Sequence, residues 1–166
     1  TYHPGQGVYR SSYQNAIRMT RTVINTAYRE SDYIRWQQFD FVVGIDIKTS
    51  KSHATWLAKY WYPRFKKGRA PLEICDRMEG RYPKTFKFIG WHPNCRCYAV
   101  PILANEETNK DWWEKPENEV KDTPSGYNDW LNENEDRILD AVKRGKLPYW
   151  IKENKKYVNI LQKQGG

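Results

Sequence analysis

The feature that most constrains the fold of this 166-residue chain is a long stretch, residues 9–38, without a single Gly or Pro. Within it, apolar and small side chains recur every three or four positions, which is the spacing of one face of an α-helix. These residues are Tyr13, Ala16, Ile17, Thr20, Val23, Ile24, Ala27, Tyr28 and Ile34, and the arginines of the other face are Arg10, Arg18, Arg21, Arg29 and Arg35. The spacing predicts one long amphipathic helix over about residues 9–38.

The next segments predict shorter elements. The stretch "FDFVVGIDIKTS" is rich in β-branched residues and predicts a strand over residues 40–48. Ser50 or Ser52 can cap a short helix that ends at Pro63. A second short helix is expected over residues 71–78.

The segment after Gly80, the predicted stop of the second short helix, is expected to form a hairpin. Two predicted strands, residues 84–91 and 96–103, are joined by a tight turn at "HPN". Helices packed on a small antiparallel sheet make the predicted fold class α+β.

Charge divides the chain near Asn105. Residues 1–104 hold 17 Lys/Arg against 7 Asp/Glu, whereas residues 105–166 hold 11 against 13, and the whole chain has a net charge of +8. We therefore expect a basic domain over 1–104 that is followed by an acidic linker over residues 105–122.

The tail, residues 123–166, is predicted to be helical. One helix is expected over residues 126–144 and ends at Gly145, and a second begins near Pro148, which suits a first helical turn. The linker before the tail contains two tryptophans that would act as an anchor, Trp112 and Trp113.

A cluster of cations marks the basic domain, within eleven residues that contain no acid: Lys59, Arg64, Lys66, Lys67 and Arg69. Aromatic residues are interleaved with it: Trp56, Tyr60, Trp61 and Tyr62. Such a surface can bind phosphates and stack bases, so it is a candidate contact for nucleic acid or an acidic partner. The alternative is a solvated loop whose aromatic neighbours enter the core.

Composition argues against several classes of protein. No apolar run approaches the roughly 20 residues of a membrane-spanning helix, and no secretory signal opens the chain, which starts at Thr1 and is expected to be part of a longer protein. Three cysteines are too few for a disulfide-rich secreted scaffold, so we expect a reducing compartment.

The strongest chemical signal is the stretch "HPNCRC", which holds two of the three cysteines and one of the three histidines. On a strand, Cys95 and Cys97 would point to the same face, and His92 precedes them across the turn. With His53 or Cys75 as the fourth ligand, these side chains predict one structural zinc ion in a tetrahedral site.

Two other states of these side chains are open. The cysteines can be small buried thiols, with the two histidines hydrogen-bonded to backbone carbonyls. A disulfide from Cys75 to Cys95 or Cys97 is the other alternative.

The order of these residues resembles the phage Mu F-like family, the minor head or head-morphogenesis proteins of tailed phages and prophages. The family pattern is Asp-x-[Arg/Lys]-Thr, a nearby His, a Gly-containing stretch and Pro-x-Cys-Arg-Cys. The matching residues are Asp46, Lys48, Thr49, His53, Gly80, His92, Pro93, Cys95, Arg96 and Cys97, and the likeness covers about residues 9–104. The tail is similar to a C-terminal stretch of such proteins from gut Bacteroides-type phages.

The resemblance implies a non-enzymatic virion component that acts in head morphogenesis or DNA delivery, and that resides in the host cytoplasm during assembly. Its partners would be portal or capsid proteins and packaged DNA, met by the basic surface, with no membrane contact. Some relatives are labelled ADP-ribosyltransferases, so an enzyme is the alternative. One such enzyme would be an ADP-ribosyltransferase-like toxin, although Glu133 and Glu135 fall in a helical pattern that separates them. The other would be a metal-independent nuclease with His53 or His92 as general base.

Overall fold

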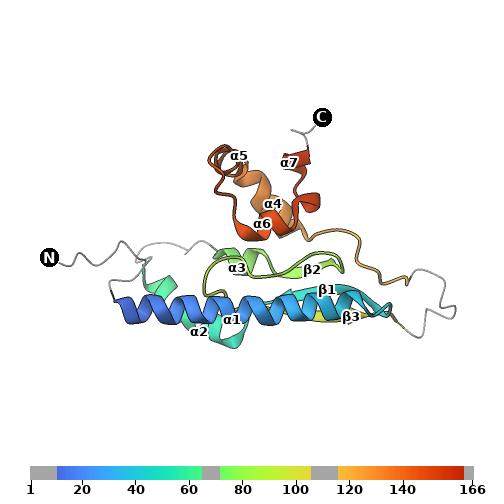
Figure 1. Cartoon of the computed structure of the whole chain (residues 1–166), viewed down its shortest axis with the longest axis horizontal. Coiled ribbons are helices and arrows are strands. Elements are labelled where there is room, and N and C mark those ends of the chain that lie inside the picture. The colour runs from blue at the N-terminus through green and yellow to red at the C-terminus, as the bar shows by residue number, and fades with distance from the viewer. Residues whose placement is uncertain (1–10, 65–71, 106–115, 163–166) are drawn as a thin grey trace.

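The computed structural model describes residues 11–64, 72–105 and 116–162 and has an α+β fold, as predicted (Figure 1). A long helix, α1 (Ser12–Gln37), runs along a three-stranded antiparallel sheet. The C-terminal helices lie beyond α3 and β2, at the top of Figure 1.

Helix α1 confirms the predicted long helix but not the packing typical of an amphipathic one. Ser11 begins it, because the Ser11 side chain accepts a hydrogen bond from the Gln14 N–H. Such a helix normally packs through its apolar face, yet none of the residues of α1 is buried. Its polar side chains, among them Asn25 and Arg29, face the domain instead, because they hydrogen-bond to a loop there.

The sheet has the order β2-β1-β3, with β1 (Val42–Lys48) in the centre, β2 (Gly80–Pro83) and β3 (Tyr98–Leu103). Two of the predicted strands, 40–48 and 96–103, are thus confirmed as β1 and β3. Most of β1 is buried, as expected for a central strand with few polar residues.

The predicted strand over residues 84–91 is wrong, and with it the predicted hairpin. Four consecutive residues, 88–91, are buried, so the segment lacks the two-faced alternation of a strand. The backbone groups of Lys87 are hydrogen-bonded to a side chain and not to a neighbouring strand. Its N–H donates to Asn154 Oδ1 at 2.8 Å, and its carbonyl accepts from Asn154 Nδ2 at 2.9 Å. Gly80, the predicted helix stop, instead begins β2 with φ at +139°.

Two short helices flank the sheet, as predicted. Ser50 caps α2 (Lys51–Trp56) through the His53 N–H, and the chain continues through a π-helical turn, η1 (Leu57–Trp61), into η2 (Tyr62–Arg64). Helix α3 (Ile74–Arg77) begins with a capping box. The Asp76 side chain accepts the Glu73 N–H, and the Glu73 side chain accepts backbone N–H groups of the first turn.

The tail is helical, but the prediction of two helices is wrong. It contains α4 (Ser125–Glu133), α5 (Glu135–Lys143), α6 (Tyr149–Glu153), the 3-10 turn η3 (Lys155–Tyr157) and α7 (Asn159–Gln162). The first predicted helix breaks at Asn134, whose side-chain amide donates to the Trp130 carbonyl at 2.8 Å and so competes with the helical backbone. The second begins after Pro148 as predicted but ends at Asn154.

Tail and sheet share one hydrophobic core. Tyr82 of β2 and Trp91 pack edge-on against Tyr127 and Trp150 of the tail, with ring centroids 5.7 Å and 5.4 Å apart. Gly126 is required where α4 crosses α3, because a Cβ there would clash with a backbone carbonyl oxygen of α3. The predicted linker also reaches the sheet, since the Val120 N–H donates to Val43 O at 3.1 Å. Its two tryptophans, Trp112 and Trp113, lie outside the described residues.

Candidate metal centre

Helix α3 and the loop before β3 bring together three potential metal ligands. The Cys75 Sγ lies 3.1 Å from His92 Nε2 and 3.8 Å from Cys95 Sγ, and all three atoms lie within 4.8 Å of one another. Two thiolates on one tetrahedral ion at ordinary metal–sulfur lengths are about 3.8 Å apart. This group could therefore hold a metal ion.

The hydrogen bond made by His92 Nδ1 leaves His92 Nε2 able to coordinate a metal ion. His92 Nδ1 lies 2.9 Å from the Pro93 carbonyl oxygen, which can only accept a hydrogen bond. Nδ1 therefore carries the proton, and the Nε2 lone pair is left to face the two thiols. This is the usual arrangement around histidines that bind metals.

All three cysteines are free and buried. At 3.8 Å the sulfurs of Cys75 and Cys95 are well beyond the roughly 2.05 Å of a disulfide bond, so the disulfide alternative does not describe this structure. Hydrogen bonds from Cys75 and Cys97 lower the pKa of the Cys95 thiol far below its ordinary value, and the bond to Cys95 raises the pKa of Cys75. The cluster thus favours a thiolate at Cys95, the form that a cation binds.

The loop that carries two of these ligands is a tight turn. Asn94 has φ of +62°, the left-handed conformation that Asn tolerates, and the Cys95 N–H donates to His92 O at 3.1 Å. Helix α1 supports this turn, because Thr22 Oγ1 accepts the Asn94 N–H at 2.8 Å.

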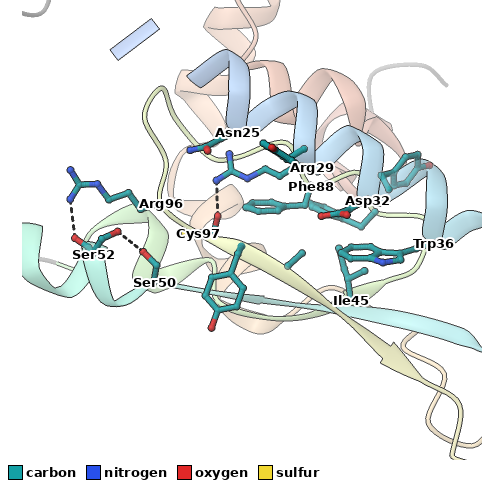
Figure 2. A pocket seen from close by; sticks show the side chains of 15 residues that line it. Asn25, Arg29, Asp32, Trp36, Ile45, Ser50, Ser52, Phe88, Arg96 and Cys97 are labelled. Atoms are coloured by element: carbon teal, nitrogen blue, oxygen red, sulfur yellow. Dashed lines mark hydrogen bonds between the residues drawn. The ribbon is translucent and has the colours of Figure 1, made fainter. Parts of the chain in front are cut away.

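Arg29, farther along α1, also holds this loop (Figure 2). Its guanidinium donates to three carbonyl oxygens, those of Ile89 at 3.2 Å, Cys95 at 2.9 Å and Cys97 at 2.6 Å. Gly90 is needed here, since a Cβ on it would lie 2.6 Å from Arg29 Nη1. In the sequence Arg29 belongs to the arginine face of the helix, and no motif marks its role in this loop.

His53 belongs to a neighbouring group rather than to the first one. It is buried, and its Nε2 lies 3.0 Å from Asp76 Oδ1. With Glu73 and Cys75 it forms a second set of potential ligands. Glu73 connects the two groups: its Oε2 accepts the Cys75 N–H at 2.7 Å, and its Oε1 lies 3.4 Å from His92 Nε2. Neither acid is among the predicted ligands, although the capping-box spacing of Glu73 and Asp76 around Cys75 is present in the sequence.

Cys97, predicted as a ligand, lies beside the cluster. It is buried and hydrogen-bonded within the group of sulfurs, but it is in neither of the two sets found among the described residues. The predicted zinc ligands are therefore divided: His92, Cys95 and Cys75 lie in one set, His53 in the other, and Cys97 next to the first.

Two cavities adjoin the centre. One of about 260 Å³ is lined by His53, Glu73 and His92 together with two cations, Arg18 and Arg96. The other, of about 450 Å³, separates α1 from β3 and is lined by Asp32, Trp36 and Phe88 among others (Figure 2). Arg96, which also lines this second cavity, donates to Ser52 O at 2.9 Å (Figure 2).

Most of the predicted basic patch lies outside the described residues. Lys59 is exposed on η1, and its Nζ lies 5.3 Å from the Tyr60 ring centroid. Arg64 ends η2, and the other members, Lys66, Lys67 and Arg69, are not described. The phosphate-binding role of the patch stays a prediction.

The two glutamates considered for ADP-ribosyl transfer lie on either side of the Asn134 break. The Glu133 carboxylate accepts two hydrogen bonds from the Arg77 guanidinium, at 2.7 Å and 2.8 Å, and this pairing lowers the pKa of Glu133. Glu133 therefore joins α4 to α3.

No family model, curated protein or solved structure matches this chain. No described helix is long and apolar enough to cross a membrane.

Proposed function

We propose that this chain is a non-enzymatic minor head protein of a tailed phage, whose domain is held together by one structural zinc ion. The observation that carries the proposal is the Cys75/His92/Cys95 group, whose two cysteines are buried. Part of the phage head pattern stated above supplies two of these side chains, His92 and Cys95.

Zinc suits this donor set better than other common metals. Two thiolates and an imidazole are soft to borderline ligands, which favour zinc over magnesium or calcium. Cys97 is the proposed fourth ligand, because it is buried beside the other sulfurs and would complete a Cys3His site. Such a closed site is structural, and it would tie α3 to the loop before β3.

The proposed setting in a phage head rests on the resemblance and is supported by the surface. Large apolar side chains are exposed on both α1 and β3, and extensive apolar exposure is typical of proteins that work within an assembly. The net charge of +8 suits contact with packaged DNA or with acidic portal and capsid surfaces. The proposed locations are the virion and, during assembly, the host cytoplasm.

Two measurements test the two halves of the proposal. Elemental analysis of protein purified without chelator should find about one zinc per chain, and a chelator should free the thiols. Mass spectrometry of virions from the phage that encodes the chain should detect its peptides at low copy number. Zinc far below one per chain would refute the metal, and absence from the virions would refute the head assignment.

A nuclease is the second candidate, favoured by one observation. The His92 side chain is 36% exposed beside the cavity that Arg18 and Arg96 line, so a phosphodiester could approach an imidazole there. The test is plasmid nicking by the zinc-free protein. If His92→Ala abolishes nicking but leaves the melting temperature of the zinc-free protein unchanged, the result would support the nuclease over the structural site.

A further inference from the structure

Helix α1 turns an uncharged face to solvent along most of its length. This outer face consists of residues that are all exposed and that share one side of the helix: Tyr13, Ala16, Thr20, Val23, Ile24, Ala27, Ser31 and Ile34. Its largest members are strongly exposed, from 49% for Ile24 to 69% for Tyr13. An apolar surface of this extent on a helix normally packs against something.

The opposite, polar face of α1 fixes this orientation. Arg29 and Asn25 donate to carbonyls of the loop that carries His92 and Cys95, and Gln37 Nε2 donates to Lys84 O at 2.8 Å. Glu30 pairs with Lys87 at 2.8 Å. Because these contacts run along the helix, α1 cannot rotate its apolar face inward without losing them.

The spacing of the outer face fits another helix. The positions 13, 16, 20, 23 and 27 follow the alternating three- and four-residue intervals of a coiled-coil seam, and Ile34 lies one further heptad along it. The position between them is Glu30, which pairs with Lys87. The alanines and other small residues between the larger side chains permit close approach of a second backbone. From Tyr13 to Ile34 the seam would extend about 32 Å.

The charges beside the seam identify the kind of partner. Arg21 and Arg35 are exposed next to the outer face, whereas the acids of α1 are turned elsewhere: Glu30 to Lys87 and Asp32 to the cavity beneath the helix (Figure 2). A second copy would bring the same arginines, on a chain of net charge +8, toward one another. Acidic residues on the flanks of the partner would be attracted instead.

We propose that the outer face of α1 binds an amphipathic helix of a partner protein whose flanking residues are acidic. This inference goes beyond the proposed head function and does not depend on it. The candidate metal centre would stabilise the position of the outer face, because the loop that holds His92 and Cys95 is also the loop that fixes α1.

Two synthetic helical peptides, each four heptads long, serve as probes for the full chain. Both have a Leu/Ile seam, and they differ only in carrying Glu or Lys at the flanking positions. Fluorescence anisotropy should show saturable binding of the Glu peptide, weaker at high salt, and at least tenfold weaker binding of the Lys peptide. Val23→Glu should lower affinity for the Glu peptide at least tenfold, and the double variant R21E/R35E should reverse the preference.

A control variant separates this face from general apolar exposure. Leu103→Glu changes a side chain of β3 that is 54% exposed and should leave binding unchanged. Equal binding of the two peptides, or no binding of the Glu peptide, would overturn the proposal. So would a dimer of the chain in sedimentation that Val23→Glu dissociates, since a second copy would then be the occupant.

Discussion

Arg29 Nη2 lies 2.6 Å from the carbonyl oxygen of Cys97, so a helix arginine directly holds the backbone of the cysteine loop. The same guanidinium binds the carbonyls of Cys95 and Ile89 and lies 5.0 Å from the centre of the Phe88 ring. One side chain thereby joins α1 to the loop that carries two of the potential metal ligands, His92 and Cys95.

Removal of the Arg29 guanidinium should destabilise the whole domain. Arg29→Met leaves three carbonyls without their charged donor, and we expect the free energy of unfolding to fall by about 3 kcal/mol in urea titrations. Arg29→Lys should recover only part of this loss, because one ammonium cannot reach all three oxygens. The control is Arg35→Met, at an exposed arginine of the same helix. Equal stability of the two Met variants would contradict the stabilising role of the Arg29 hydrogen bonds.

The division of the predicted ligands into two sets can be tested by zinc content. Cys75→Ser should reduce bound zinc to near zero and lower the melting temperature, because Cys75 belongs to the set with His92 and Cys95. His53→Gln should retain zinc, since His53 binds Asp76 in the neighbouring set. Loss of zinc in both variants would place His53 in the coordination shell.

Asn154 should be among the least replaceable polar residues. It is 1% exposed, and its side chain serves both backbone groups of Lys87 and the Trp150 carbonyl. Asn154→Ala should cost about 3 kcal/mol or more, because buried backbone groups lose their partners. Asn132→Ala, at an exposed position of α4, is the control for chemical denaturation, and a similar small effect in both would refute this role.

Docking of the tail on α3 predicts unequal effects for two glycines. Gly126→Ala should destabilise the protein strongly, because the new Cβ would clash with the carbonyl oxygen of Arg77 and push α4 away. Gly145→Ala meets nothing within 4 Å and should cost only the left-handed strain of its φ, +64°, about 1 kcal/mol. Thermal melts compare the two, and a smaller loss for Gly126→Ala would argue against close packing of α4 on α3.

Buried tyrosines should make the fold sensitive to alkali. Burial raises the pKa of Tyr82 and Tyr127 above the ordinary value and that of Tyr149 to about 12. These phenols stay protonated in the folded state, whereas in the unfolded chain they release protons near pH 10. The contribution of these tyrosines to the free energy of unfolding should therefore be constant below about pH 10 and fall as the pH rises further.

Tyr127→Phe provides the matched variant for this pH dependence. The Tyr127 hydroxyl finds no hydrogen-bond partner among the described residues, so its removal should leave stability at pH 8 equal or higher. The loss of stability above pH 10 should become shallower because one titrating group is gone. An unchanged slope in urea titrations from pH 8 to about pH 11.5 would show that Tyr127 does not contribute.

Local pattern was sufficient for the elements that it describes fully. Residues 12–37 form a helix because nothing in them interrupts helical spacing, and Ser50 and the Glu73 capping box begin the short helices at their own positions. The concentration of Cys and His in "HPNCRC" likewise indicated a possible metal site before its partners in space were known.

Only the tertiary structure decided which faces and which partners those elements acquire. Helix α1 turns its apolar side outward because hydrogen bonds from Arg29 and Asn25 to the cysteine loop outweigh its amphipathic pattern. Residues 84–91 are not a strand because a side chain of the distant tail, Asn154, takes the backbone groups of Lys87. Cys75 meets His92 and Cys95 across the fold, and contacts between residues so far apart in the chain depend on packing that no local spacing encodes.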